Sequence, residues 1–308
     1  MTGITMTSKI FRIIVLGLCL TLFSVGSAFA QASENAAAES YNMGIEAVQK
    51  GDTTDAITYY LAAITADANF ADAYFNLGSI YFAQGNYMES AKNFKKVTEL
   101  DPSSAEGFAN YGKVLFVQEK YDDALNAYTS ALQADPEHFE AVKELGKLYY
   151  KKGDRKNLEA YDKAIEMLEK YVKHDSTDSY SYYLMGMAYK QKKNYGKAID
   201  NFQKAIKYDP NNFESLNSLA GIYLTQQSYS QAIDYFEKAL KLKPKNFRTA
   251  RNLAIAIQSR DPENYDAAIA AWETFLKIAR GNSAATKYVT QAEQLVKDLK
   301  DAKAISGE

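Results

Sequence analysis

Residues that commonly carry out catalysis or bind metal ions are scarce in this 308-residue chain. It contains two histidines, His138 and His174, and a single cysteine, Cys19. Neither histidine has a nucleophile or a second metal ligand close to it in the sequence, so both are expected in surface loops. The chain also lacks the HExxH, GxSxG and GxxxxGKS/T motifs and any paired cysteines. We therefore expect no catalytic activity, cofactor or metal site, unless residues far apart in the sequence converge.

Small residues, in contrast, recur along the chain at a nearly constant interval. One series is spaced by 34 residues with a single interval of 40, and comprises Gly44, Gly78, Gly112, Gly146, Gly186, Ala220 and Ala254. A second series keeps the same period with one interval of 40 and one of 36, and comprises Ala56, Ser90, Ala124, Ala164, Ala198, Ala232 and Ala268. Four of the five prolines also share one position in this period: Pro102, Pro136, Pro210 and Pro244. Such self-similarity indicates a repeat architecture.

The stretch 71–104 shows what is repeated. Counting Gly78 as position 8 of a 34-residue frame, the other markers are Tyr74 at 4, Leu77 at 7, Tyr81 at 11, Gly85 at 15, Tyr87 at 17, Phe94 at 24 and Pro102 at 32. This pattern resembles the tetratricopeptide repeat (TPR), which is two short helices joined by a turn. The resemblance covers residues 37–282 and implies an all-α fold, an α-solenoid wound as a right-handed superhelix. It implies seven repeats, at 37–70, 71–104, 105–138, 139–178, 179–212, 213–246 and 247–282.

Each marker has a physical role in such a repeat. Small side chains at positions 8 and 20 let the two helices of a repeat approach closely where they cross. Proline at position 32 ends the second helix, because it cannot continue the helical hydrogen bonding. A single repeat cannot bury its apolar face, so the core comes from stacking neighbours.

Three segments depart from the regular frame. Repeat 4 carries six extra residues near Gly153–Ala160, which either lengthen the turn or extend a helix, and repeat 7 has two extra residues at 261–264. Beyond the repeats, residues 283–304 have apolar residues at helical spacing, with Ser283 as the expected N-cap. We expect one amphipathic helix there that closes the end of the stack.

Residues 1–30 form a different kind of sequence. Lys9 and Arg12 are their only charges, and the apolar run 13–25 is too short to span a bilayer. A small-x-small site follows, so the segment is expected to be a secretory signal peptide cleaved between Ala30 and Gln31. Residues 31–36 would then be a short polar entry, and the protein would be exported, to the periplasm or secreted, with no stable membrane insertion.

Two alternatives to cleavage at Ala30 remain open. The segment could be retained as an anchor, or Cys19 could carry a lipid, although Leu18 before it is larger than the usual small residue. After cleavage the chain has no cysteine and a net charge of −4. This mild acidity argues against a nucleic-acid partner, which would need a basic surface.

The family resemblance also indicates where ligands would bind. In TPR superhelices, positions 2, 5, 6, 9, 12 and 13 of the first helix line the concave side. At position 6 the chain has Asn42, Asn76, Asn110 and Asn252, resembling the asparagine ladder with which some TPR proteins hold an extended peptide backbone. Asparagine is also the commonest TPR residue at this position, so the row has a structural explanation too.

A lysine-rich patch is expected beside that row. Lys143, Lys147 and Lys151 lie at i, i+4 and i+8 on one helix face, flanked by Lys113 and Lys190. An aromatic row at position 12 accompanies them: Phe82, Phe116 and Tyr150. Together these residues predict a concave groove for extended segments with acidic and apolar side chains. Alternatively, pairing of the lysines with Glu140 and Glu144 would leave an ordinary solvated face.

The leading functional hypothesis is therefore an exported, non-catalytic adaptor that binds peptide segments of other proteins. The known carboxylate clamp of chaperone-binding TPR proteins is not the expected mode, because no three successive repeats supply its full set of Lys, Asn and Arg. The alternative is a self-assembling structural scaffold of an envelope or compartment complex. An enzyme would need a site hidden from sequence motifs, and the oligomeric state is left open.

Overall fold

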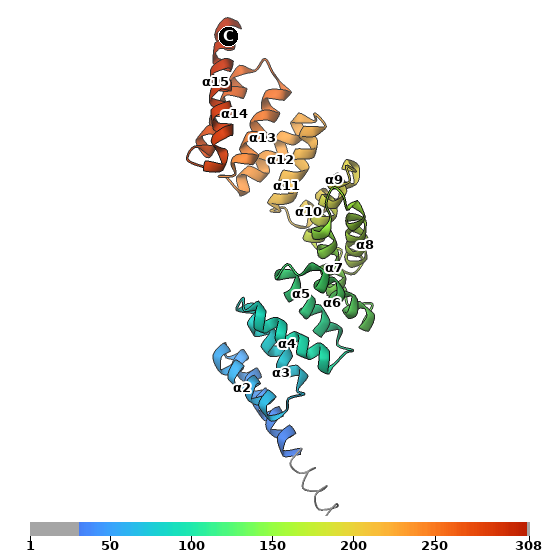
Figure 1. Ribbon diagram of the computed structural model, residues 1–308. Coiled ribbons are helices and arrows are strands. Elements are labelled where there is room, and N and C mark those ends of the chain that lie inside the picture. Colours follow the sequence, from blue (N-terminus) through green and yellow to red (C-terminus); the bar gives the residue numbers. More distant parts are fainter. Residues whose placement is uncertain (1–30, 307–308) are drawn as a thin grey trace, which may run out of the picture. The chain divides into compact units, whose positions relative to one another are not determined.

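The computed structural model describes residues 31–306, so the predicted signal peptide and its last residue, Ala30, lie outside the described residues. Every regular element within 31–306 is a helix, which confirms the predicted all-α repeat fold. The chain divides into two compact units at Ala141 and Val142, within the first turn of α7. Consecutive helices alternate with short turns in each unit (Figure 1).

The first unit begins with a helix over 31–49. Its further helices are α2 (Thr53–Ala66), α3 (Ala71–Ala83), α4 (Tyr87–Leu100), α5 (Ala105–Val117) and α6 (Tyr121–Ala134). The first helix already includes residues 31–36, where the sequence suggested only a polar entry.

The second unit contains the longer part of the described chain. Its helices are α7 (Phe139–Lys152, whose first turn belongs to the first unit), α8 (Leu158–His174), α9 (Ser179–Gln191), α10 (Tyr195–Tyr208), α11 (Phe213–Thr225), α12 (Tyr229–Leu242), α13 (Phe247–Arg260), α14 (Tyr265–Ala279), the 3-10 turn η1 (Ser283–Ala285) and α15 (Thr286–Ser306).

Short polar residues start most of these helices. Asn86 and Asn194 accept the backbone N–H three residues ahead at the start of α4 and α10, and Asp178 and Asn212 do so for α9 and α11. These contacts satisfy N–H groups that have no partner within the helix. In repeats 1, 2, 3, 5 and 6 the turn between the two helices contains one left-handed residue, which is Gly51, Gly85, Glu119, Lys193 and Gln227 in turn.

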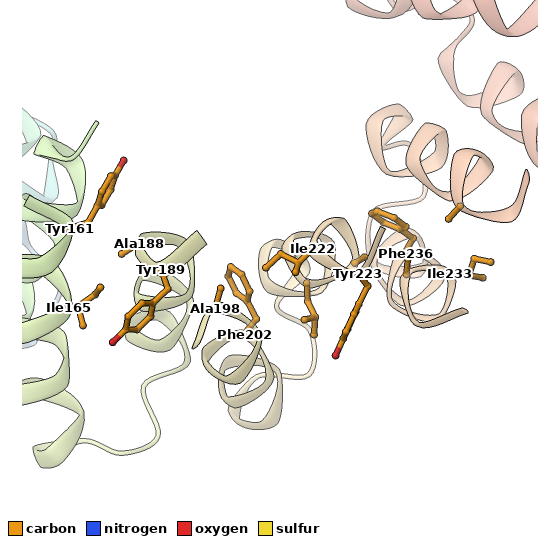
Figure 2. Packing of buried hydrophobic residues seen from close by; sticks show 14 residues of the cluster. Tyr161, Ile165, Ala188, Tyr189, Ala198, Phe202, Ile222, Tyr223, Ile233 and Phe236 are labelled. Carbon is orange, nitrogen blue, oxygen red and sulfur yellow. The ribbon is translucent and has the colours of Figure 1, made fainter. Parts of the chain in front are cut away.

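The small residues at position 8 lie where the helices of a repeat cross, as predicted. A Cβ atom added to Gly78 would lie 3.1 Å from the Phe94 ring, and one added to Gly186 would lie 2.8 Å from the Phe202 ring. The largest hydrophobic cluster runs from α8 to α13 within the second unit, so one repeat's core continues into the next (Figure 2). The core is therefore shared between neighbours.

The six extra residues of repeat 4 are divided among three elements. Compared with repeat 2, α7 is one residue longer than α3, the turn is two residues longer, and α8 is three residues longer than α4. The insertion therefore both lengthens the turn and extends the helices. The turn is closed by Tyr161, whose hydroxyl donates to the carbonyl of Gly153 at 2.9 Å.

The C-terminal helix packs on the last repeat as expected. Ala292, Val296 and Leu299 of α15 are buried in a cluster with Leu276 and Ala279 of α14. Ser283 does not cap α15, because it lies in η1. Asn282 caps that 3-10 turn, accepting from the Ala284 N–H at 3.0 Å.

Candidate binding face

Within each unit, we call the side chains at positions 2, 5, 6, 9, 12 and 13 of the repeats' first helices the first-helix face; the sequence placed its candidate residues at these positions. Those candidates fall in both units. The first unit holds Asn42, Asn76, Phe82, Asn110, Lys113 and Phe116, and the second holds Lys143, Lys147, Tyr150, Lys151 and Asn252.

The asparagine row of the first unit is partly engaged within the protein. Asn42 is exposed, whereas Asn76 Nδ2 donates to the Tyr41 hydroxyl at 3.2 Å. Asn110 Nδ2 donates to the Glu106 backbone oxygen at 3.0 Å and to Glu106 Oε1 at 2.7 Å. Among the described residues, nothing donates to the side-chain carbonyl oxygens of these three asparagines. The row therefore offers acceptors, while three N–H groups of Asn76 and Asn110 are already used.

His138 lies in the loop between α6 and α7, as the sequence predicted, but its ring makes contacts that the sequence did not predict. Its Nδ1 accepts the Ala141 backbone N–H at 3.1 Å, and its Nε2 lies 2.9 Å from Glu106 Oε2. Because Nδ1 accepts, the ring proton must lie on Nε2 and is donated to Glu106. His138 thus caps the start of α7 and links it to Asn110 through Glu106. His174 is the last residue of α8, and its ring lies 6.4 Å from that of Tyr171.

The aromatic row of the first unit carries a cation. Lys113 Nζ lies 5.3 Å from the centre of the Phe82 ring, a distance at which the ring attracts the ammonium. Phe82 and Phe116 each pack on the tyrosine that opens the second helix of their own repeat, with ring centroids 5.5 and 5.7 Å apart. Both rings are partly exposed, so the row remains accessible to a ligand.

The three lysines of α7 have different environments. Lys143 Nζ lies 3.0 Å from Asp178 Oδ1 and 4.8 Å from the centre of the Tyr171 ring. Lys147 Nζ lies 2.6 Å from Glu144 Oε1, and the Glu144 side chain is only 7% exposed. Lys151 is exposed. Two of the three charges are thus balanced within the protein, one of them by the Glu144 pairing that the sequence allowed.

Hydrogen bonding keeps Asp178 ionised beside Lys143. Burial acts to raise the pKa of Asp178, but hydrogen bonds from Ser181 and Lys143 outweigh it, and the pKa falls below its ordinary value of 3.8. Asp178 also caps α9, since its Oδ2 accepts the Ser181 N–H at 2.8 Å. The lysine and the helix cap therefore depend on the same carboxylate.

Tyrosines that the sequence did not single out surround Tyr150. Burial, together with Tyr183, Tyr161 and Tyr180, raises the pKa of Tyr150 to about 12. Burial also raises the pKa of Tyr183, whose ring centroid lies 6.0 Å from that of Tyr180. The hydroxyls of Tyr150 and Tyr183 therefore stay protonated at neutral pH and can donate hydrogen bonds. Tyr180 and Tyr183 occupy positions 2 and 5 of repeat 5, which is the signal that would have found them.

Residues 31–306 hold neither a metal-binding cluster nor a helix able to span a membrane. No three His, Cys, Asp or Glu side chains gather closely enough to hold a metal ion. No described helix has both the length and the apolar composition needed to cross a bilayer.

Known proteins share the fold. Two family profiles, both described as Tetratricopeptide repeat, match residues 41–105 and 183–247, and residues 115–188. No curated protein matches the chain. Among solved structures, MamA is 26% identical with a TM-score of 0.51, covering 60% of this chain and 94% of MamA.

Two further structures are more distant in sequence. The C-terminal part of a TPR repeat-containing protein from Cytophaga hutchinsonii is 21% identical, with a TM-score of 0.63 over 80% of this chain and 98% of that one. YrrB, described as a TPR protein with an unusual peptide-binding site, is 21% identical, with a TM-score of 0.53 over 62% of this chain and 96% of YrrB. The profile matches, the 34-residue period and the stacked helix pairs together place this chain in the tetratricopeptide repeat family.

Proposed function

We propose that this protein is a non-catalytic interaction scaffold whose first-helix face binds extended segments of other proteins. The observation that carries the proposal is the asparagine row Asn42, Asn76 and Asn110, which recurs once in each of the first three repeats with unused side-chain carbonyl oxygens. An extended backbone presents N–H donors at regular intervals, so a row of acceptors can bind it whatever its sequence.

The family supports this proposal, because TPR proteins generally act as binding scaffolds rather than as enzymes. YrrB is described as having a peptide-binding site. Its likeness to this chain concerns the fold, and the proposed residues rest on the asparagine row itself. Partly exposed Phe82 and Phe116 beside the row would receive apolar side chains of the bound segment.

We further propose that the scaffold acts outside the cytoplasm, in the periplasm. The support is residues 1–30, with Lys9 and Arg12 before an apolar run and a small-x-small site ending at Ala30. The N-terminal sequence of protein isolated from the periplasmic fraction should begin at Gln31. A chain that still begins at Met1 would show a retained leader and contradict this part of the proposal.

The binding proposal is tested with the chain starting at Gln31. The double variant Asn76→Ala with Asn110→Ala should lose crosslinked envelope partners that the unaltered chain retains, with no change in helicity. Asn69→Ala with Asn201→Ala is the matched control, since Asn69 lies in a turn and Asn201 is a partly exposed residue of α10, the second helix of its repeat. If the first double variant keeps the same partners, the asparagine row is not the binding element.

One observation favours self-assembly as the second candidate. The first repeat exposes large apolar side chains, with Met43 41%, Val48 49% and Leu61 47% exposed. Such residues at the end of a repeat stack would suit contact between copies. Sedimentation of the chain from Gln31 separates the two candidates. A self-assembling scaffold must sediment as oligomers, and Met43→Ser with Val48→Ser should reduce the oligomeric fraction.

A further inference from the structure

Gly221 has no packing role in its own helix. It lies inside α11, and a Cβ atom added there would meet nothing within 4 Å. The position-8 glycines differ, because a Cβ at Gly112 or Gly186 would lie 2.8 Å from an aromatic ring. Glycine weakens a helix relative to alanine, so a glycine without an internal reason suggests that something outside the chain approaches the backbone closely.

Lys190 lies on the neighbouring helix α9, one turn beyond the residue that contacts Ser218 of α11. Asn212, which caps α11, donates from Nδ2 to Ser179 Oγ at the start of α9 at 3.1 Å. Further along, Ser218 Oγ lies 3.7 Å from Met187 Sδ. The two helices therefore run in the same direction, and the next turn brings Lys190 opposite Gly221.

Lys190 is a partly buried cation without a counter-ion. Among residues 31–306, no carboxylate lies within ion-pair distance of its Nζ, and burial lowers the pKa of its ammonium group. Lys143 and Lys147 of α7 differ from Lys190, since they are paired with Asp178 and Glu144. A charge taken partly out of water without a partner is unfavourable, and a bound carboxylate would compensate it.

The rest of the α9 face is aromatic and apolar. Tyr180, Tyr183, Met187 and Lys190 recur at three- and four-residue intervals and therefore lie on one side of the helix. The Tyr180 side chain is exposed and Tyr183 is partly exposed. No described residue forms a hydrogen bond with the hydroxyls of Tyr180 or Tyr183. The surface thus combines an apolar area with the Lys190 ammonium and two tyrosine hydroxyls that can donate, which is complementary to a carboxylate next to an apolar residue.

We propose that this surface of α9 and α11, the α9–α11 site, binds an acidic side chain of an extended segment from a partner protein. Lys190 pairs with the Asp or Glu carboxylate, the segment's backbone passes over Gly221, and an adjoining apolar side chain packs on Tyr183 and Met187. An internal side chain is the occupant, because passage over Gly221 requires the backbone to continue beyond the carboxylate. The inference rests on the proposed scaffold function and adds a chemical preference to it.

The test uses an array of ten-residue peptides with blocked ends, in which each peptide carries a Glu and a Phe or Leu two to four residues from it. Each peptide has a partner of the same sequence in which Gln replaces that Glu. The chain from Gln31 should bind a subset with at least tenfold preference for Glu over Gln. Lys190→Met should reduce this ratio to about one, while the exposed control Lys241→Met should leave it unchanged. A third set of peptides carries Gln in place of Glu and a free C-terminal carboxylate. Stronger binding of this set than of the Glu peptides would show that the site prefers a chain end to an internal side chain.

Variants of Gly221 provide a second test, in which stability should rise with one substitution and binding should fall with another. Gly221→Ala should raise the thermal unfolding temperature, because the methyl group meets no protein atom, and Gly221→Leu should weaken binding of the Glu peptides at least tenfold. A folded Gly221→Leu variant that still binds the Glu peptides normally would overturn the proposal, and so would a folded Lys190→Met variant that keeps the Glu preference. A Glu-to-Gln ratio near one in the unaltered chain, or a stronger preference for a free C-terminus, would also overturn it. Failure to bind any array peptide would also overturn it. Binding without a Glu preference would leave the scaffold function standing, since that is tested separately through Asn76 and Asn110.

Discussion

A single methyl group at position 8 of a repeat changes how closely its two helices can approach. At Gly186 an added Cβ would lie 2.8 Å from the fully buried Phe202 ring, so the ring or the helix must shift. We expect Gly186→Ala to destabilise the protein by about 1–3 kcal/mol, the usual cost of overpacking. Urea unfolding followed by circular dichroism measures this. Gly196→Ala is the matched control, because its Cβ would meet only Asn194 Oδ1 at 4.0 Å; equal losses in both variants would contradict the explanation.

The Asp178 carboxylate predicts a pH dependence of stability. Its pKa is lower in the folded protein than the ordinary 3.8, because hydrogen bonds from Ser181 and Lys143 favour the ionised form over the opposing effect of burial. A lowered folded pKa stabilises the protein at pH values above the ordinary pKa, and this contribution is lost as pH falls below it.

The variant Asp178→Asn isolates that contribution, because its amide oxygen can still cap α9 but carries no charge. Unfolding free energies of both proteins should be measured between pH 3 and pH 7. The advantage of the unaltered protein should be largest near neutral pH and should shrink below about pH 4. A difference that stays constant over this range would show that the charge does not matter.

At the scale of the element, the start of α7 depends on an unusual cap. His138 Nδ1 accepts the Ala141 N–H, and its other ring nitrogen contacts Glu106 of α5. His138→Ala removes both contacts and should cost about 1 kcal/mol of stability, as the loss of an N-cap usually does. His138→Asn restores a capping oxygen and should recover most of that loss. Thermal unfolding of the two variants checks this, and equal destabilisation would mean that the cap contributes nothing.

At the same scale, the sequence predicts contacts within a repeat but not contacts between repeats. The period predicted the helix pairs and the crossing glycines, because these depend on contacts within a repeat. Contacts between repeats depend on register, which the frame does not give. That is why the Asn76–Tyr41 bond, the Lys143–Asp178 pair and the His138 cap were not predicted. The division of the repeat 4 insertion among α7, its turn and α8 was likewise undetermined, since each arrangement preserves the later period.

At the scale of the whole molecule, stability comes from contacts between neighbouring repeats. The second unit's largest hydrophobic cluster joins α8 through α13, while a separate cluster joins α13, α14 and α15. In such stacks a perturbation weakens mainly the repeats beside it. The sequence predicted this arrangement from its period, and it predicted the closing helix from the apolar spacing of residues 283–304.

Removing residues 283–308 should therefore destabilise one end of the stack selectively. Val296 and Leu299 bury their side chains against the last repeat, and burial of each is worth roughly 1.5–3 kcal/mol. We expect amide hydrogen exchange to accelerate at least tenfold in α13 and α14 and to stay unchanged in α3 to α6.

Point variants test the same contacts without truncation. Leu299→Ala should reproduce a smaller, equally local acceleration, and Lys297→Ala on the exposed side of α15 should not. The physical reason is that only the buried side chain holds α15 on α14, so only its loss opens the last helix pair to water. Acceleration spread evenly over both units would show that the chain unfolds as one cooperative body, and that α15 does more than close the adjoining repeat.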